Sequence, residues 1–578
     1  MPGAWTALIF ACVSFSPSLV PRPGLLQGVV CGISAAIGYG LGVVGASVWR
    51  AFPDRPACPP RRWSWPVFYA VGAVLLLVCW LLGQRWQGQL RDMMSAPAES
   101  WWSKLLLPVS AALVFVLLVA IGRGLRGAYR WLWGLLSRWI GRRAARAIGW
   151  VAVTGNLIEA VGASTEPAPA ATRTVDATDC LITPGLVNSH HHIFQNLTRA
   201  YPAMTDKPLF GWLQSLYPLW RAIDEESVYA SAFVGLAELA LSGCTTSTDH
   251  LYLHPRGAGD LLSAEIAAAR DLGMRFHPTR GSMSLSEKDG GLPPDDVVAD
   301  DDEILAASEA AVARHHDRGH GAMVRIALAP CSPFSVTEQL MVRSAELAER
   351  LDVRLHTHFA ENAEDDAFSL ATFGCRPMEY LERTGWCTDR TWVAHCVMPN
   401  DDEQRRLGAA GIGVAHCPSS NLILASGISP VVAMRAAGVK VGLGVDGSSS
   451  ADSASLWMEA RQAMLLAKLR DGAHAGTARM ALEMATLGGA GCLGREGEIG
   501  VIAPGAVADI AVWKLTGPSF AGALADPIEA WLRCGPVSAW HTIVNGRFVV
   551  REGEILHPDL PQVLHSHARH AARIQRLD

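Results

Sequence analysis

What this 578-residue chain lacks narrows its class before any motif is considered. Its 13 cysteines include no CxxC pair and follow no regular spacing, which argues against a disulfide framework and fits a reducing compartment. It also lacks a basic excess, because the formal net charge is −5, so nothing overall points to nucleic acid as a partner. Hydrophobic residues make up 50% of the chain, which is ample material for a large core.

Charge is scarce along the first 150 residues, where most of the excess hydrophobicity lies. The last three of the four apolar stretches there are long enough to cross a bilayer core, which takes about 20 apolar residues. The first is marginal, and it lacks the basic start of a signal peptide. We therefore predict a membrane region with about four helices over residues 1–150, with buried helices of a soluble domain as the alternative. The four stretches are 5–20, 25–49, 65–83 and 105–122.

Basic residues between the apolar stretches predict the orientation of this region. Four arginines separate the second stretch from the third, and seven follow the fourth. The loop between the third and fourth stretches carries Arg85, Arg91 and Lys104, partly offset by two acidic residues. The positive-inside rule then places everything after the fourth stretch in the cytoplasm. We expect an inner-membrane protein with a cytoplasmic catalytic domain, and an amphipathic helix on the inner leaflet at residues 129–148.

From Val151 onward, short apolar runs alternate with Ala- and Leu-rich helical patterns. This alternation is typical of repeated βα units. Eight such units close into a (β/α)8 TIM barrel, and an open doubly wound sheet is the alternative. The candidate strands are 181–189, 244–250, 275–279, 324–329, 353–358, 391–396, 413–416 and 441–445.

The segments that flank this barrel also look like strands. Residues 151–161, 506–513 and 542–551 read as short β-runs, and we expect them to form one small β-sandwich. The predicted fold class is therefore α/β, with a barrel, a small sandwich and a preceding helical membrane region. The predicted domains are 1–150 for the membrane region, 184–499 for the barrel, and 151–183 with 500–578 for the sandwich and a C-terminal tail.

Three histidines end the first predicted strand. Alternate residues of a strand face the same side, so His190 and His192 point together into the barrel mouth and His191 points away. His358, after the fifth strand, adds a third imidazole, and Asp446, after the eighth, adds a carboxylate oxygen. Three nitrogens and one oxygen, with a position left for water, suit one catalytic Zn²⁺. Fe²⁺ accepts the same ligand types, so iron is the alternative.

Three polar groups beside this predicted metal site have expected catalytic roles. The metal would lower the pKa of its water to about 7 and so supply hydroxide. Glu361, three residues past His358, lies outside the ligand set and would carry a proton to the leaving group. His395, at the end of the sixth strand, would polarise the water or the developing oxyanion. Asp446 would take the water proton while remaining a ligand.

These motifs together resemble the amidohydrolase superfamily. The pattern is similar to that of nucleobase deaminases with a single metal, and the spacing HxHxxQ, which here ends at Gln195, is similar to that of guanine deaminases. That resemblance implies that Gln195 hydrogen-bonds a purine edge. The matching segments are PGLVNSHHH (184–192), HTHFAEN (356–362), VAHC (393–396), HCPSSN (416–421), GLGVDG (442–447), IGVIAPGAVADIAVW (499–513) and VNGRFVV (544–550).

Longer segments resemble the bacterial 8-oxoguanine deaminases. The resemblance implies hydrolytic deamination of a small purine-like substrate, 8-oxoguanine, to urate and ammonia. The carrying segments are SHHHIFQNLTRAYPA (189–203), LFGWLQSLYPLW (209–220), LSGCTTSTDHLYL (241–253), RGSMSLSEKDGGLPPD (280–295) and APCSPFSV (329–336).

Several residues have both a functional and a structural interpretation. We expect Gln195 to bind substrate rather than simply to start a helix. Trp212 is a candidate for stacking on a purine, with core packing as the alternative, and Cys331 is either a substrate contact or a buried thiol. His416 and Asn421 are candidates for groups that support the site from behind. His250 and His277 are expected to be structural.

The N-terminal region carries a resemblance of its own. The stretch FSPSLVPRPGLLQGVVCGISAAIGYGLGV, residues 15–43, resembles the membrane N-terminal region of bacterial α/β-hydrolase-like proteins, but no GxSxG elbow follows. Amidohydrolases have a longer sandwich before HxH, so we expect the leading strand to be missing, with RAARAIGW (143–150) in its place. Either the chain is a membrane-tethered fusion, or a gene-boundary error joined two halves and the enzyme is cytoplasmic.

Three classes of function are therefore open. The first is an aminohydrolase acting on 8-oxoguanine or on a related guanine, pterin, cytosine or s-triazine ring. The second is another reaction at the same metal, such as dechlorination. The third is a vestigial barrel on a membrane protein, against which the full ligand set argues. The expected partners are the small-molecule substrate and a membrane through residues 1–150, and a homo-oligomer is left open.

Overall fold

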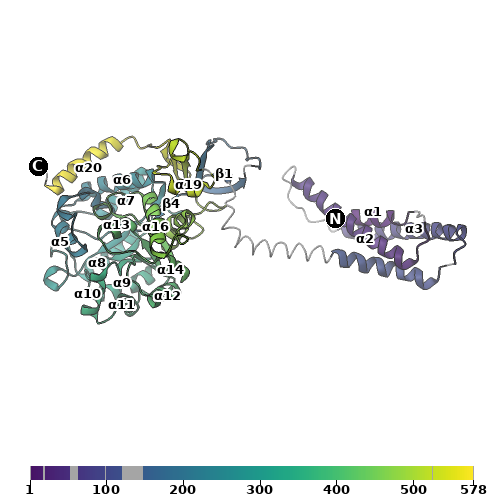
Figure 1. Ribbon diagram of the computed structural model, residues 1–578, viewed down its shortest axis with the longest axis horizontal. Helices are drawn as coiled ribbons and strands as arrows, with labels where there is room; N and C mark the ends of the chain where they lie inside the picture. Colours follow the sequence, from purple (N-terminus) through teal and green to yellow (C-terminus); the bar gives the residue numbers. More distant parts are fainter. Residues whose placement is uncertain are drawn as a thin grey trace. The chain divides into compact units, whose positions relative to one another are not determined.

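The computed structural model describes residues 2–16, 20–51, 63–97, 99–119, 148–163, 165–523 and 525–576. The chain divides into two compact units, Met1–Arg146 and Ala147–Asp578; in Figure 1 the first is purple to blue and the second runs from blue through teal and green to yellow. The amphipathic segment expected at residues 129–148 lies outside the described residues, apart from Ile148.

The first unit consists of apolar helices. They are α1 (Pro2–Val13), α2 (Gly24–Ala51), α3 (Ser64–Met93) and a further helix over Trp101–Val119. The last three contain spans long and apolar enough to cross a membrane, whereas α1 is shorter. Among the described residues, the sequence-predicted set of about four helices therefore becomes three candidate spans and one short apolar helix.

Glycines of α2 allow its close approach to the helix over Trp101–Val119. A Cβ atom at Gly28 would lie 1.9 Å from Ser110 Oγ, and one at Gly24 would lie 1.9 Å from the carbonyl oxygen of Ser103. Small residues at this spacing are a common device for packing helices in lipid. Large apolar side chains of α3 face outward, among them Val74 at 62% exposure. An apolar exterior of this kind is suited to a lipid environment.

Short parallel strands form the wall of a barrel in the second unit. They are β4 (Leu186–Asn188), β6 (Cys244–Ser247), β7 (His250–Leu251), β8 (Arg275–Phe276), β9 (Thr279–Ser282), β10 (Ala327–Pro330), β11 (Leu355–Phe359), β12 (Thr391–His395), β13 (Gly413–His416) and β14 (Lys440–Leu443). The pairs β6 with β7 and β8 with β9 are each one interrupted strand, because β6 pairs with β8 and β7 pairs with β9. The ladder runs on from β9 to β14, and β14 pairs with β4. The predicted (β/α)8 fold is confirmed.

Helices cover the outside of this wall, as the labels of Figure 1 show for α8, α9, α11 and α12. Many begin at a side-chain cap: at the start of α12, for example, the Asn400 side chain accepts the backbone N–H of Glu403. The helices are α5 (Leu209–Trp220), α6 (Glu225–Leu241), α7 (Leu261–Leu272), α8 (Asp301–His315), α9 (Glu338–Leu351), α10 (Ala363–Phe373), α11 (Pro377–Arg383), α12 (Asp401–Ala410), α13 (Pro418–Ile423), α14 (Val431–Ala436), α15 (Ser448–Ala451), α16 (Leu456–Asp471), α17 (Ala478–Glu483), α18 (Gly489–Cys492), α19 (Pro527–Arg533) and α20 (Leu560–Gln575).

Two small antiparallel sheets are built from the flanking segments. The larger contains β3 (Cys180–Pro184), β16 (Ile510–Lys514), β17 (His541–Val544), β18 (Arg547–Arg551) and β19 (Glu554–Ile555), and the smaller contains β1 (Ile148–Thr154) and β2 (Leu157–Ala163). The Ile158 N–H donates to the Ala506 carbonyl at 2.8 Å, which joins β2 to the segment that follows the barrel in the sequence. One small β-sandwich was expected from the flanking segments, which form these two antiparallel sheets, and residues 148–150 of RAARAIGW belong to β1.

The first predicted strand, 181–189, is divided between two sheets. β3 joins the outer sheet, whereas β4 joins the barrel. Gly185 lies between them, and a Cβ atom there would come within 2.1 Å of Thr245 Oγ1. A glycine is therefore required where the chain passes from the outer sheet into the barrel wall.

Candidate metal centre and catalytic pocket

The first and last barrel strands bring the predicted ligands together. β5 (His191–His192) follows β4, and β15 (Asp446–Gly447) follows β14, and these two short strands pair in parallel. The Asp446 N–H donates to the His190 carbonyl at 3.2 Å. Asp446 and His395 have φ of 58° and 68°, a left-handed conformation that non-glycine residues adopt at some cost and that often marks functional sites.

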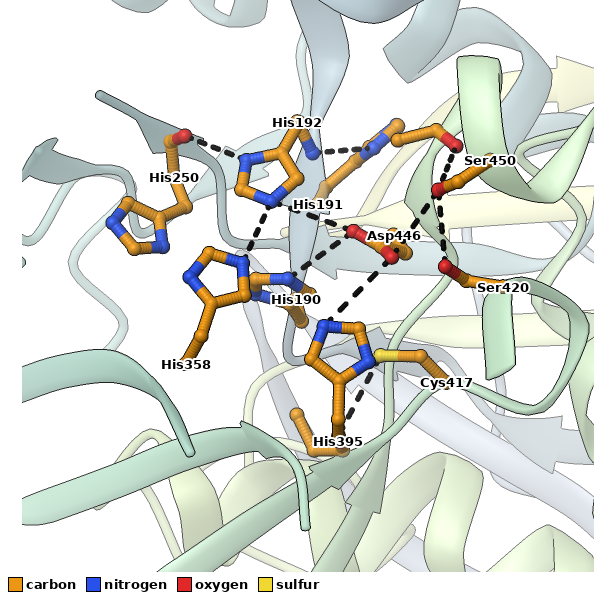
Figure 2. Close-up of polar contacts among 12 residues, drawn as sticks. His190, His191, His192, His250, His358, His395, Cys417, Ser420, Asp446 and Ser450 are labelled. Carbon is orange, nitrogen blue, oxygen red and sulfur yellow. Dashed lines mark hydrogen bonds and ion pairs between the residues drawn. The ribbon is translucent and has the colours of Figure 1, made fainter. Parts of the chain in front are cut away.

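The side chains of these strand ends converge on one point, as Figure 2 shows. Asp446 Oδ1 lies 3.3 Å from His190 Nε2 and 3.4 Å from His192 Nε2. His192 Nε2 in turn lies 3.1 Å from His358 Nε2. All four residues are buried. The structure therefore assembles the predicted ligands from the ends of the first, fifth and eighth strand positions.

Backbone carbonyls fix which nitrogen of His192 and His358 carries a proton. His192 Nδ1–H donates to the His250 carbonyl at 2.8 Å, and His358 Nδ1–H donates to the Cys331 carbonyl at 2.6 Å. Burial lowers the pKa of His192 to about 3, so its ring is neutral near pH 7. The two Nε2 atoms therefore face each other at 3.1 Å with a lone pair each. Two such lone pairs repel unless a cation lies between them.

His190 presents a lone pair to the same point through a longer chain of contacts. His356 Nδ1–H donates to the Trp392 carbonyl at 2.9 Å, so His356 Nε2 is an acceptor. His190 Nδ1–H therefore donates to His356 Nε2 at 2.8 Å. That leaves His190 Nε2 with a lone pair facing the Asp446 carboxylate. Three imidazole nitrogens and one carboxylate oxygen, all without a proton between them, fit a divalent cation of the zinc type.

His250 adds a fourth imidazole that the sequence analysis had interpreted as structural. Its ring nitrogen lies in one group with those of His190, His192 and His358, in which the candidate ligand atoms are all within 4.8 Å of one another. Its Nε2 donates to the Ala329 carbonyl at 3.1 Å, and its ring stacks on His358 with centroids 5.0 Å apart. His250 ends the second strand position, and this placement was the signal that could have identified it.

Glu361 and His395 lie beside the ligand cluster. His395 Nε2 is 3.7 Å from Glu361 Oε2 and 3.8 Å from Asp446 Oδ2. His395 Nδ1 donates to Asn421 Oδ1 at 3.0 Å, so Asn421 supports the site from behind. Burial raises the pKa of Glu361 to about 8. A carboxyl group with this pKa can hold a proton at neutral pH and release it to a base.

Asp446 differs from Glu361 in its protonation. Burial alone would raise the pKa of its carboxyl group, but His190 and the other nearby imidazoles hold that pKa well below its ordinary value. Ser450 Oγ also donates to Asp446 Oδ2 at 3.3 Å. The site thus contains one carboxylate that stays ionised and one carboxyl that keeps a proton, which is the pairing expected of acid–base chemistry.

One pocket opens beside this cluster and contains all three predicted substrate residues. Trp212 lies on α5, and Cys331 follows β10, with its Sγ 3.9 Å from His358 Nδ1. Tyr252, which sequence reasoning missed, follows His250 at alternate spacing and so reaches the same side of the chain. His416, on β13, is buried but does not belong to this lining. His277 is also buried and also lies outside the lining. The lining residues are His192, Gln195, Leu209, Trp212, Leu213, Tyr217, Tyr252, Cys331, Phe334, His358, Glu361, His395, Leu424, Asp446 and Ser450.

Gln195 belongs to this pocket lining, and its side chain has an acceptor without a partner among the described residues. Its Nε2 lies 3.4 Å from the Tyr252 hydroxyl, whereas its Oε1 is buried and has no hydrogen-bond partner among the described residues. A Cβ atom at Gly447 would lie 1.7 Å from that oxygen, so only glycine leaves room for the carboxamide. A buried oxygen without a partner favours a ligand that brings an N–H group.

Comparisons with known proteins agree with these observations. Residues 181–549 match the model of the amidohydrolase family, and residues 15–188 match that of the alpha/beta-hydrolase family N-terminus. The chain is 47% identical over 429 residues to an 8-oxoguanine deaminase of Pseudomonas aeruginosa, covering 74% of this chain and 94% of that protein. Both resemblances stated from the sequence are thereby confirmed.

Other relatives act on different rings by their names. The chain is 38% identical over 380 residues to a hydroxydechloroatrazine ethylaminohydrolase of Pseudomonas sp. (strain ADP), covering 64% of this chain and 78% of that protein. Among solved structures, it is similar to a zinc complex of atrazine chlorohydrolase from Arthrobacter aurescens TC1, with a TM-score of 0.70 and 33% identity over 73% of this chain and 94% of that one. The comparisons therefore identify the family of enzymes, but they leave the substrate open.

Proposed function

The chain belongs to the amidohydrolase family, and on this basis we propose that it deaminates 8-oxoguanine hydrolytically to urate and ammonia. Water adds at C2 of the ring, the bond from C2 to the amino nitrogen breaks, and that nitrogen leaves as ammonia. The observation that carries the choice of substrate is the 47% identity to an 8-oxoguanine deaminase over 94% of its length.

We propose that His190, His192, His358 and Asp446 hold one divalent metal, and that this metal is zinc, with iron as the alternative. When bound there, the cation lowers the pKa of a water so that hydroxide is available near pH 7. The support is the set of unprotonated donors that face one another, together with the zinc in the solved structure to which this chain is similar.

Side chains of the protein then accept and donate the protons of the reaction. Asp446, ionised and anchored by Ser450, takes the proton of the attacking water on Oδ2. Glu361 holds a proton in a buried site and donates it to the leaving amino group. His395 donates Nδ1–H to Asn421 and directs Nε2 toward these two carboxyl groups. With a second proton on Nε2, it polarises the water and the oxyanion that develops.

Substrate recognition is proposed for other residues of the same pocket. Gln195 Oε1 accepts a ring N–H of the purine, which satisfies an oxygen that has no other partner among the described residues. Trp212 and Cys331 supply flat and soft apolar surface against the ring.

A second candidate is deamination of a hydroxylated s-triazine. It is favoured by the relative named hydroxydechloroatrazine ethylaminohydrolase and by the similarity to an atrazine chlorohydrolase structure. A triazine and a purine both present a C–N bond on a planar ring, so the same metal and acid can serve either.

The test is ammonia release by the purified full chain in detergent. We expect turnover of 8-oxoguanine, with urate formed in equal amount, and at least tenfold lower kcat/KM for guanine, isoxanthopterin and a hydroxylated triazine, since a ring that leaves a buried polar group unpaired loses about tenfold or more. An aliquot stripped with a chelator should lose activity and regain it with Zn²⁺. Preference for another of these rings would overturn the substrate, and no ammonia from any of them would overturn the class.

We also propose a membrane location for the whole chain. Residues 1–150 would form an inner-membrane region, with the barrel at 184–499 and the sandwich with its tail at 151–183 and 500–578 in the cytoplasm. Three apolar helices and the match to the alpha/beta-hydrolase family N-terminus support this arrangement.

A further inference from the structure

The last helix of the chain packs on the segment that carries Gln195. This segment is η1, Ile193–Thr198, and it follows directly on the metal-binding histidines. From α20, His567 Nε2 lies 2.8 Å from Asn196 Oδ1, and Gln575 Nε2 donates to the Leu197 carbonyl at 2.6 Å. Arg573 fastens the same helix to Asp224 at 2.8 Å. Two side chains of α20 thus hold the residues on the C-terminal side of Gln195.

Asn196 has one orientation in this arrangement. Its Nδ2 donates to the Ser231 carbonyl at 3.0 Å, and its Oδ1 accepts from Ser231 Oγ at 2.7 Å. The same Oδ1 therefore accepts from His567 Nε2, which carries the proton. Burial lowers the pKa of His567 to about 4, so the ring is neutral near pH 7 and donates from one nitrogen only. Asn196 itself is 5% exposed.

Gln195 has little freedom within this segment. Its carbonyl accepts from Thr198 Oγ1 at 3.1 Å and from Ser449 Oγ at 2.9 Å. Its side-chain Oε1 lies so close to the Cα of Gly447 that a Cβ atom there would be 1.7 Å away. A shift of the η1 backbone by a few tenths of an ångström would therefore move the free Oε1 within the pocket.

We propose that His567 is a positioning residue for substrate binding, and that it acts through Asn196 to hold Gln195 Oε1 in the pocket. The inference rests on the proposed role of Gln195 in binding the ring. His567 itself belongs neither to the ligand cluster nor to the pocket lining among the described residues. Its loss should therefore weaken binding and leave the chemical step intact.

The kinetic test is a double-mutant cycle on the full chain in detergent. We expect His567→Phe to raise KM for 8-oxoguanine about tenfold with kcat within about twofold, since one well-placed hydrogen bond corresponds to about tenfold in binding. His567→Gln keeps an N–H donor and should restore most of the loss. In a Gln195→Ala background, which should itself raise KM, His567→Phe should add no further increase. His565→Phe on the exposed side of α20 is the matched control and should match wild type.

Three kinetic outcomes would overturn the inference. They are an unchanged KM in Gln195→Ala, additive effects in the cycle, and a fall in kcat as large as the rise in KM. If the wild-type protein does not deaminate 8-oxoguanine, the proposed substrate is wrong instead. The double-mutant cycle is then measured with whichever substrate the wild type does deaminate.

A second readout needs no substrate. Amide hydrogen exchange of the peptide containing residues 193–198 should rise in His567→Phe and stay at the wild-type level in His565→Phe. The same peptide should stay protected in Gln195→Ala, because the contacts of Asn196 and Leu197 remain. Unchanged exchange in His567→Phe would show that α20 does not hold this segment, whatever the substrate proves to be.

Discussion

Backbone carbonyls direct the imidazoles of the metal centre. The carbonyls of His250 and Cys331 accept the Nδ1–H of His192 and of His358, so the Nε2 lone pairs of these two rings point into the cluster. The Trp392 carbonyl accepts from His356, which in turn accepts from His190 and so leaves the His190 Nε2 lone pair facing the cluster. Carbonyls cannot change protonation state with pH, so the tautomers of these rings are fixed by the fold itself. Such outer contacts orient metal ligands and raise their basicity.

Replacing Glu361 by glutamine tests the assigned proton donor. The amide cannot hand a proton to the leaving nitrogen, so we expect kcat to fall by about 10²- to 10⁴-fold, the usual contribution of a general acid. Metal analysis should find the same one equivalent of zinc as in wild type, because Glu361 is outside the ligand set. Glu349→Gln, an exposed change on α9, is the control. Full activity in Glu361→Gln would remove the mechanism as assigned.

Adding a methyl group at Gly447 tests the binding role of Gln195. The new Cβ would lie 1.7 Å from Oε1, so the carboxamide must leave its place. We expect KM for 8-oxoguanine to rise about tenfold, the factor that corresponds to one lost hydrogen bond, with the zinc content unchanged. Gly211→Ala on α5 is the control, since its Cβ would meet Lys207 only at 3.9 Å. An unaltered KM would show that the carboxamide does not bind the ring.

At the scale of elements, one buried ion pair joins the barrel to the outer sheet. Arg275 of β8 donates through Nε to Asp509 Oδ2 at 2.8 Å and through an Nη to Oδ1 at 3.1 Å, and both side chains are almost fully buried. Arg275 also donates to the carbonyls of Gly321 and Ala322, and Asp509 accepts the Asn545 N–H. The pair therefore joins the first residue of β8, a barrel strand, to the residue that precedes β16 of the outer sheet.

Breaking this pair should destabilise the catalytic unit. Asp509→Asn leaves the Arg275 guanidinium buried without a counter-charge, which typically costs about 3–5 kcal/mol. We expect a clear fall in the thermal unfolding temperature of the full chain, followed by circular dichroism. Arg221→Met removes an ion pair with Asp296 in which both side chains are about half exposed, and it should change that temperature little. Equal effects of the two variants would contradict the assignment.

At the scale of the whole molecule, apolar helices and a catalytic barrel occur in one chain. The helices carry exposed large apolar side chains, whereas the barrel buries its own around the strands. Two solvents therefore fit the two units: lipid for the first and water for the second.

Fractionation of cells that express the full chain tests this arrangement. We expect activity and protein in the membrane pellet after a high-pH carbonate wash, and release only by detergent, because helices of this length and hydropathy are held by lipid rather than by charge. A cytoplasmic marker enzyme should stay in the supernatant. Protein that appears in the soluble fraction, or that carbonate removes, would contradict membrane insertion.

Much of the fold and of the centre could be predicted because the signals are local. The strand at Gly413–His416 has the predicted bounds, since its two apolar residues stand between a glycine and a polar histidine, which leaves little choice. The ligands follow from their place at the ends of strands, as His358 does near the end of β11. The division of residues 181–189 at Gly185 was not predictable, because both halves are apolar and only the partners in space differ.

By itself, the sequence determined the alternation that makes a barrel, the residue types that suit a divalent metal, and the apolar stretches of the first unit. These three properties are encoded by periodicity and motif spacing, which act over short distances along the chain. Only the tertiary structure decided which lone pairs face one another, that His250 joins the cluster, and that Gln195 Oε1 has no partner among the described residues. The contact of Asn196 with His567 spans 371 positions, and no local pattern encodes a contact that depends on how the whole barrel closes.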